Sequence, residues 1–261
     1  MHNYAAELLG LDYVYVSFDV HPDNLRKIFN GVRGLGIKGL NVTVPHKEKV
    51  IPFLDRVEED ASIMGAVNTI TLDNGCLVGA NTDGTGFIKS IAAEGLDPNG
   101  KKVAIVGAGG SARAIGVALC RAGASSITVI NRSASRGKRL ARHLSKLGDV
   151  SFVASDSESE RVKEATYASD LIVQTTPCGM KRTDPLPAEQ VAFRKGQLLC
   201  DIIYTIETPF MKKARSMGAR AINGLGMLVC QGSESFRIWT GHSFPEKEIL
   251  GFLKRILSKG G

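Results

Sequence analysis

The sequence predicts an α/β protein with two α/β domains, the first built on a mixed sheet and the second on a doubly wound parallel sheet. Strand-like and helix-like patterns alternate along most of the 261-residue chain, as in folds that pack helices against a sheet. A glycine-rich run, 107–112, directly follows a short apolar strand and opens a helix. An Asp-Asn-Gly sequence at 73–75 lies between two strand-like runs, which is a strong hairpin signal.

The first elements follow from the spacing of apolar residues. Alternating apolar and polar residues over 13–20 predict a strand, and helical spacing over 22–35 predicts a helix. The short β-branched run 39–44 predicts a buried parallel strand. Helical spacing resumes over 47–64, which predicts one or two helices with a break near Pro52.

A hairpin and a helix follow. The runs 67–72 and 76–80 are expected to pair across their turn, and 83–94 has the pattern of a helix. A Pro/Gly-containing linker comes next. We therefore expect a first domain at residues 1–95, completed by closing helices within 226–261, and a second domain at 96–225.

The second domain has the most regular alternation of patterns, which predicts a parallel sheet. Its strands are expected at 103–106, 127–130, 151–154, 171–174, 198–203 and 219–222. Helices are expected at 112–121, 135–147, 225–239 and 246–257.

Composition excludes several classes of protein. No apolar run reaches the roughly 18 residues of a membrane span, and no signal peptide is visible. The five cysteines are scattered without a Cys-x-x-Cys pair, so we expect no zinc site, no disulfide framework and a reducing, cytoplasmic setting. The net charge of +7 comes from basic residues along helix-like segments without interleaved aromatics. This charge fits an anionic small molecule better than a nucleic acid.

The glycine-rich run predicts a dinucleotide site. It reads Gly107-Ala108-Gly109-Gly110-Ser111-Ala112, between a strand and a helix. Glycines allow a tight turn and close approach of the backbone to a pyrophosphate, and the helix N-terminus offers free N–H groups. The alternative is a plain glycine turn between strand and helix.

The end of the next strand predicts which dinucleotide binds. An NAD site usually has Asp or Glu there, to bind the ribose 2′-hydroxyl. This chain has Asn131-Arg132-Ser133 instead, followed by Arg136 and two further basic residues. Guanidinium groups bind a 2′-phosphate in bidentate fashion, so we predict NADP(H). A basic, solvated helix start is the alternative.

Two further runs each bring a charged side chain to a polar loop. Lys47 ends the run 41–47, and Asp83 lies within 81–86. A lysine and an aspartate in one site can handle a proton. Lys47 can instead be a surface lysine, and Asp83 can be a helix N-cap. The sequence does not decide which of the two transfers the proton.

The runs 41–47, 81–86 and 107–112 together resemble the shikimate dehydrogenase family, over nearly the whole chain. The resemblance implies a Rossmann-like second domain and reversible NADPH-dependent reduction of 3-dehydroshikimate to shikimate, a step of chorismate and aromatic amino-acid biosynthesis. It also implies that Lys47 and Asp83 belong to the catalytic centre, in a cleft between the domains.

The resemblance assigns further residues to the substrate and the cofactor. Residues implied to contact the substrate are Asn41, Thr43, Asn68, Asn81, Tyr204 and Gln231. Residues implied to contact the cofactor are Gly107 to Ala112, Asn131, Arg132, Ser133, Arg136, Thr176, Ile202, Gly224 and Met227. We expect no metal, no nucleic acid and no membrane partner, and a monomer or a homodimer.

The chain departs from the family pattern at its start. Family members carry a strand and a Ser-x-Ser-Pro motif before a Met-His-Asn like the one at 1–3, and their serines would contact the substrate carboxylate. Without them we expect a poorly active or unstable first domain. Two alternatives follow: an NAD-preferring quinate/shikimate dehydrogenase, or a nucleotide-binding homologue with little activity.

Overall fold

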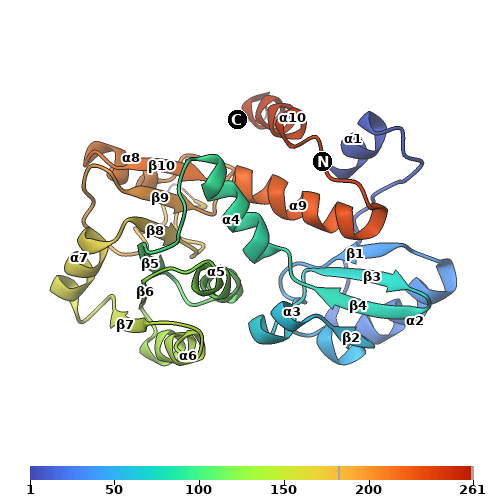
Figure 1. Ribbon diagram of the computed structural model, residues 1–261, viewed down its shortest axis with the longest axis horizontal. Helices are drawn as coiled ribbons and strands as arrows, with labels where there is room; N and C mark the ends of the chain where they lie inside the picture. Colours follow the sequence, from blue (N-terminus) through green and yellow to red (C-terminus); the bar gives the residue numbers. More distant parts are fainter. Residues whose placement is uncertain (182, 260–261) are drawn as a thin grey trace. The chain divides into compact units, whose positions relative to one another are not determined.

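The computed structural model describes residues 1–181 and 183–259, without the side chain of Lys259 (Figure 1). The chain forms two compact units. The first unit comprises Met1–Gly86 and Val229–Gly261, and the second comprises Phe87–Leu228. Helices α4 (Asp83–Ala93) and α9 (Leu225–Thr240) each run from one unit into the other.

The first unit contains a mixed four-stranded sheet, which confirms the predicted sheet type. Its strands are β1 (Gly39–Asn41), β2 (Arg56–Val57), β3 (Thr69–Asp73) and β4 (Cys76–Ala80). They lie in the order β1-β3-β4-β2, with β2 parallel to β4 and the other pairs antiparallel. The register sets Thr69 beside Asn41 and also beside Ala80. Polar residues at these strand ends are thereby brought together at the same end of the sheet.

The predicted hairpin is confirmed, because β3 and β4 are antiparallel and joined by Asn74-Gly75. These two residues have φ values of 49° and 82°. A turn with positive φ at both central residues matches the twist of a hairpin, and Asn-Gly is the pair that adopts it most readily.

Helices α2 (Leu25–Leu35) and α3 (Glu59–Met64) pack on this sheet, with 3₁₀ turns at Pro22–Asn24 and Ile51–Phe53. Helices α1 (His2–Leu8) and α10 (Glu246–Lys259) pack instead with α9 in a separate hydrophobic cluster. Helix α2 ends at Gly36 in the left-handed conformation, as the predicted helix over 22–35 requires. The core contains Phe29 and Val32 of α2 against Ile70 and Leu77 of the hairpin.

The strand predicted over 13–20 is wrong. Residues 11–21 contain no helix or strand, and Val14 and Phe18 are 80% and 68% exposed. The backbone of Tyr15 exchanges hydrogen bonds with the side chain of Asn3, at 2.6 and 2.9 Å, rather than with a neighbouring strand. An alternating pattern predicts a strand only where a ladder partner exists.

Two other expectations for the first unit need correction. The strand predicted over 39–44 covers only Gly39–Asn41, and it is antiparallel and half-buried rather than parallel and buried. The region 47–64 does not form one or two long helices. It begins with turns, passes Pro52 in a 3₁₀ turn, adds the short strand β2 and ends in the helix α3. Lys47 therefore lies in a turn.

The second unit contains the predicted parallel sheet. Its strands are β5 (Lys102–Val106), β6 (Ser126–Asn131), β7 (Val150–Ala154), β8 (Leu171–Gln174), β9 (Leu198–Asp201) and β10 (Arg220–Asn223). They lie in the order β10-β9-β8-β5-β6-β7, all parallel. The order in which the chain adds strands reverses between β5 and β8: β6 and β7 follow on one side of β5, and β8, β9 and β10 follow on the other. Open α/β sheets bind ligands at the carboxyl ends of strands at such a switch point.

The helices of the second unit are α5 (Gly110–Arg121), α6 (Ala134–Leu144), α7 (Ser159–Ala168) and α8 (Pro209–Ser216). Helices α7 and α8 were not expected from the sequence. The first turn of α8 has Pro209 after Thr208, whose hydroxyl caps the helix by accepting from Met211 N. None of the helices formed by the described residues is long and apolar enough to cross a membrane.

Candidate functional site

Lys47 and Asp83 form an ion pair in the first unit. The Nζ of Lys47 lies 2.7 Å from Oδ2 of Asp83, and the two side chains are 23% and 10% exposed. The backbone of Lys47 is fixed because its carbonyl accepts from Val67 N at 2.8 Å. Asp83 begins α4, where a carboxylate interacts favourably with the helix dipole. The two predicted catalytic residues thus come from different parts of the fold, a turn and the start of a helix, and are in contact.

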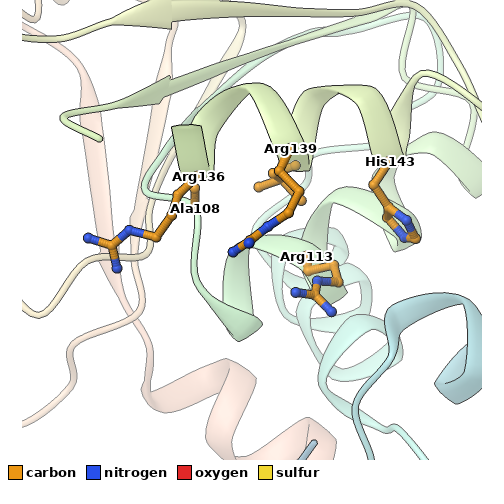
Figure 2. A pocket seen from close by; sticks show the side chains of 6 residues that line it. Ala108, Arg113, Arg136, Arg139 and His143 are labelled. Atoms are coloured by element: carbon orange, nitrogen blue, oxygen red, sulfur yellow. The ribbon is translucent and has the colours of Figure 1, made fainter. Parts of the chain in front are cut away.

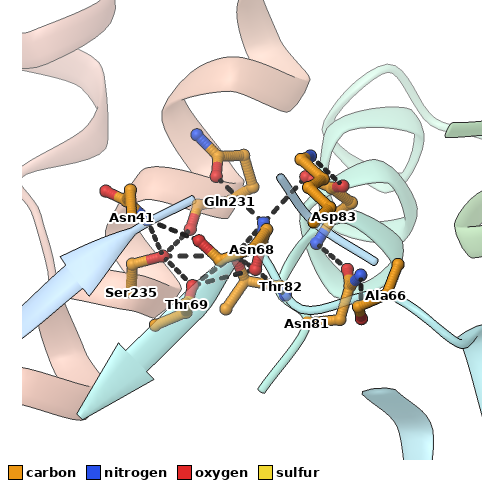
Figure 3. Close-up of polar contacts among 10 residues, drawn as sticks. Asn41, Ala66, Asn68, Thr69, Asn81, Thr82, Asp83, Gln231 and Ser235 are labelled. Atoms are coloured by element: carbon orange, nitrogen blue, oxygen red, sulfur yellow. Dashed lines mark hydrogen bonds and ion pairs between the residues drawn. The ribbon is translucent and has the colours of Figure 1, made fainter. Parts of the chain in front are cut away.

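Asn68 connects this pair to a network of amides and hydroxyls (Figure 3). Its Nδ2 donates to Asp83 Oδ1 at 2.8 Å, to Thr82 Oγ1 at 3.0 Å and, at 3.5 Å, to Gln231 Oε1. Its Oδ1 accepts from Thr82 N at 2.8 Å. Both oxygens of Asp83 therefore receive a hydrogen bond, one from Lys47 and one from Asn68.

Asn41 and Gln231 reach the same network from β1 and α9. Asn41 Nδ2 donates to the hydroxyl of Ser235 at 3.0 Å and to the carbonyl of Asn68 at 3.2 Å. The Ser235 hydroxyl also lies 2.7 Å from that of Thr69 and 3.2 Å from that of Thr82. These three hydroxyl groups were missed by the sequence analysis. The signal for Ser235 was its spacing of four residues from Gln231, which places both on one face of a helix.

Asn81 and Thr43, the other two polar residues predicted in this unit, differ in burial and in hydrogen bonding. Asn81 is buried, and both polar atoms of its amide are hydrogen-bonded: Oδ1 accepts from Asp83 N at 3.0 Å, and Nδ2 donates to Ala66 O at 2.9 Å. It therefore fixes the start of α4. Thr43 is exposed, and its side chain does not join the hydrogen-bond network around Asn68.

The predicted glycine loop lies at the switch point of the second unit, between β5 and α5. Gly107 has φ of 118°, and a Cβ there would lie 2.3 Å from Thr175 Oγ1. Only glycine fits this turn. Gly109 precedes α5 without a side-chain cap, so N–H groups of the first turn remain available to an anion.

A basic pocket of about 180 Å³ lies beside this loop (Figure 2). Its lining residues are Ala108, Arg113, Arg136, Arg139, Leu140 and His143. The predicted residues Ala108 and Arg136 are thus brought together. Asn131 and Ser133 lie next to each other at the end of β6, where Asn131 Nδ2 donates to Ser133 O at 2.8 Å. Arg132 is exposed and does not line the pocket.

The loops after β8 and β9 are held by a buried network. Gln174 Nε2 donates to the carbonyls of Thr176 and Cys178 at 3.1 and 3.0 Å. Asp201 Oδ2 accepts from the Thr208 hydroxyl at 2.7 Å, and its Oδ1 accepts from Ile203 N at 3.1 Å. Burial raises the pKa of Asp201, and these two hydrogen bonds oppose that shift. The network fixes the loop of Thr176 and the loop that begins at Ile202.

The remaining predicted residues lie near the same strand ends. Gly224 packs so closely on Ile202 that a Cβ would be 2.1 Å from its carbonyl oxygen. Met227 is buried and Tyr204 is 36% exposed. These four residues therefore lie at the carboxyl ends of the parallel strands, where the glycine loop also lies.

Three parts of the chain match described families. Residues 1–70 match the shikimate dehydrogenase substrate binding domain, residues 89–186 match shikimate / quinate 5-dehydrogenase, and residues 224–250 match the shikimate 5'-dehydrogenase C-terminal domain. These matches fall on both units.

Similar proteins extend the match to the full length. Shikimate dehydrogenase (NADP(+)) of Desulforamulus reducens is 41% identical, over 100% of this chain and 91% of its own. The enzyme of the same name from Moorella thermoacetica is 43% identical, over 94% and 84%. The crystal structure of shikimate 5-dehydrogenase from Listeria monocytogenes, in complex with shikimate and NAD, superposes with a TM-score of 0.90 at 31% identity, over 97% of this chain and 90% of that one. The chain therefore belongs to the shikimate dehydrogenase family.

Proposed function

We propose that the protein catalyses the reversible, NADPH-dependent reduction of 3-dehydroshikimate to shikimate, as a step of aromatic amino-acid biosynthesis. The observation that carries the proposal is the Lys47–Asp83 ion pair, at 2.7 Å, beside a cluster of neutral hydrogen-bonding side chains. Reduction of a ketone requires a hydride at carbon and a proton at oxygen, and a lysine–aspartate pair suits the second requirement.

The protein's own residues handle the proton in this scheme. When bound, NADPH supplies the hydride. We assign Lys47 Nζ as the donor of the proton to the ketone oxygen, and as its acceptor in the reverse direction. Asp83 holds Lys47 in place and accepts a hydrogen bond from a substrate hydroxyl. Asn68 fixes the second oxygen of Asp83 at 2.8 Å, so the carboxylate cannot turn away from Lys47.

Neutral groups around the pair match a substrate with several hydroxyl groups. Asn41, Asn68 and Gln231 each present an amide, which can both donate and accept. Thr43, on the exposed stretch before Lys47, completes the set of this unit that we propose for the substrate. A site that hydrogen-bonds each hydroxyl discriminates strongly against analogues that lack one.

The second unit is suited to NADP(H). Glycine at position 107 permits the tight turn of the phosphate-binding loop, because a Cβ there would collide with Thr175. The first turn of α5 supplies N–H groups for the pyrophosphate. Arg132 and Arg136 follow β6, where an acidic residue would favour NAD. We propose that Thr176, Ile202, Gly224 and Met227 surround the nicotinamide.

An NAD-preferring enzyme that also accepts quinate is the second candidate. One observation favours it: the similar enzyme from Listeria monocytogenes was crystallised with shikimate and NAD. The absence of an acidic residue at 131–133 favours NADP instead.

The rate of NADP reduction with shikimate tests the proposal, measured beside NAD and beside quinate. We expect the highest kcat/KM with NADP and shikimate. A higher kcat/KM with NAD, or with quinate, would establish the second candidate. Saturable NADPH binding without turnover of either substrate would refute the proposed reaction and leave a dinucleotide-binding protein.

A further inference from the structure

We propose that Tyr15 is a positioning residue of the substrate site: its hydroxyl holds the carboxamide of Asn41 in the orientation that binds the substrate. The sequence pattern assigned Asn41 to the substrate and gave Tyr15 no role beyond an expected strand. The inference rests on the proposed function for the identity of the substrate. It draws into the site a segment, residues 11–21, that forms neither helix nor strand.

One hydrogen bond joins the two residues. The hydroxyl of Tyr15 lies 3.2 Å from Oδ1 of Asn41. A carboxamide oxygen accepts and cannot donate, so the hydroxyl is the donor. Burial raises the pKa of Tyr15 above its ordinary value of 10.0, so the phenol keeps this proton at neutral pH.

The other end of the same amide is fixed by two acceptors. Asn41 Nδ2 donates to the carbonyl of Asn68 at 3.2 Å and to the hydroxyl of Ser235 at 3.0 Å. Because a carbonyl oxygen only accepts, the contact with Asn68 determines which end of the amide faces Tyr15. The amide is therefore held at both ends, and it cannot rotate without breaking a hydrogen bond.

Tyr15 is itself anchored through its backbone and its ring. The side chain of Asn3 accepts from Tyr15 N at 2.6 Å and donates to Tyr15 O at 2.9 Å. The ring of Tyr15 stacks on that of His2, with centroids 4.3 Å apart. The neighbours Val14 and Val16 are 80% and 55% exposed, against 38% for Tyr15. Tyr15 is thus fixed within a stretch that is otherwise open to solvent.

The anchored hydroxyl is connected to the proton-handling pair. Asn41 binds the carbonyl of Asn68, and the amide of Asn68 donates to Asp83 Oδ1 at 2.8 Å. Tyr15 contacts the first member of this chain and neither Lys47 nor Asp83. Its loss should therefore disturb the binding of the substrate more than the transfer of the proton.

Tyr15→Phe tests the inference, because it keeps the ring and removes only the hydroxyl. We expect KM for shikimate to rise about two- to tenfold, the usual effect of losing one neutral hydrogen bond. The kcat and the KM for NADP should each change less than about twofold, because the ion pair and the second unit keep their contacts. Calorimetry should show the same loss of affinity for shikimate.

Tyr13 offers a matched control in the same segment. It is 44% exposed, and its hydroxyl makes no hydrogen bond within residues 1–181 and 183–259. Tyr13→Phe should leave KM and Kd for shikimate unchanged. Equal rises in the two variants would show that any hydroxyl of this segment has the same effect, and they would overturn the inference.

A double-mutant cycle distinguishes action through Asn41 from an independent contact with the substrate. In an Asn41→Ala background, Tyr15→Phe should weaken shikimate less than about twofold further, because residues that act through one another are not additive. Full additivity would mean that Tyr15 acts independently of Asn41, contrary to the inference. A melting curve of each variant establishes that it is folded.

The remaining outcomes separate this inference from the proposed reaction. Turnover of shikimate by the unmodified protein, with KM and Kd unaltered in Tyr15→Phe, would refute the role of Tyr15 alone. A fall of kcat as large as the rise of KM would also refute it, since Tyr15 would then act on the proton-handling pair. If the unmodified protein binds shikimate without turnover, the proposed reaction fails and the Kd values still decide the role of Tyr15. If it neither binds nor oxidises shikimate, both proposals fail.

Discussion

The ammonium group of Lys47 and the carboxylate of Asp83 lie 2.7 Å apart although 36 residues separate them in sequence. Neither belongs to a long regular element at the point of contact, because Lys47 lies in a turn and Asp83 is the first residue of α4. The hairpin β3–β4 lies between them in sequence and brings its two ends together. Lys47 is tied to the residues just before this hairpin, because its carbonyl accepts from Val67 N at 2.8 Å, and Asp83 follows the hairpin's other end.

Replacement of Lys47 by alanine should abolish most turnover. We expect kcat for shikimate oxidation to fall by about 10²–10⁴-fold, the usual contribution of a positioned proton donor. Binding of NADPH should be unchanged, because the change lies in the other unit. Lys49→Ala, which removes an exposed lysine of the same turn, is the matched control and should keep its activity. Comparable losses in both variants would show that Lys47 acts only through surface charge.

The Ser235 hydroxyl should orient the amide of Asn41. It is fully buried and lies within 3.2 Å of polar groups of Asn41, Thr69 and Thr82. Ser235→Ala leaves these groups short of a partner, which should lower the free energy of unfolding by about 1–3 kcal/mol. We expect KM for shikimate to rise several-fold with a smaller change in kcat.

The control for that variant is Ser233→Ala, on the same helix. The Ser233 hydroxyl is also buried but accepts from Phe244 N at 3.0 Å, away from Asn41. It should lose similar stability with no change in KM for shikimate. A rise of KM in both variants would mean that Ser235 contributes only to the stability of α9.

The contrast between the hairpin and the preceding region shows which features a sequence can reveal. Asn74 and Gly75 adopt positive φ for local reasons, so the turn was predictable from two residues. The same holds for the glycine loop, where strand, loop and helix follow directly on one another. Both features depend on the chemistry of adjacent residues.

Residues 13–20 and Ser235 depend on partners distant in sequence. Alternation over 13–20 predicted a strand, but a strand forms only where a neighbour completes its ladder. Ser235 joins the hydrogen-bond network because α9 packs on the end of β3. No pattern in the residues around Ser235 indicates this packing. Likewise, the sequence showed a basic run after β6, but only the packing of α5 against α6 determined that Arg139 lines the pocket and Lys138 does not.

His2 should make the stability of the protein depend on pH below neutrality. It is 6% exposed and stacks on Tyr15 with ring centroids 4.3 Å apart. Burial, assisted by the nearby N-terminal charge, lowers its pKa from 6.5 to about 4. The unfolded chain therefore binds a proton between pH 6.5 and about 4 that the folded protein does not bind. By linkage, stability falls as the pH is lowered through that window.

The difference between the protein and a His2→Phe variant isolates this effect. Between pH 7 and pH 4 we expect the unmodified protein to lose up to about 3 kcal/mol more than the variant, since each pKa unit corresponds to about 1.4 kcal/mol. Unfolding by urea at several pH values measures it. Parallel stability curves for the two proteins would show that His2 is protonated equally in both states.

Thr208 should hold the loop after β9 in place for the cofactor. Its hydroxyl donates to Asp201 at 2.7 Å and accepts from Met211 N at 3.1 Å, so one side chain both satisfies a buried carboxylate and caps α8. Thr208→Val keeps the shape but loses both bonds. The lost cap alone costs about 1 kcal/mol, and the Asp201 carboxylate loses one of its three described donors, which are Thr208, Ile203 N and Gln174. Because the loop begins at Ile202, against which Gly224 packs, we also expect KM for NADP to rise.

Thr208→Ser retains the hydroxyl and should restore both properties, as measured by thermal unfolding and by initial rates. If valine and serine variants lose the same stability and the same cofactor affinity, the methyl group of Thr208 and not its hydroxyl is what positions the loop.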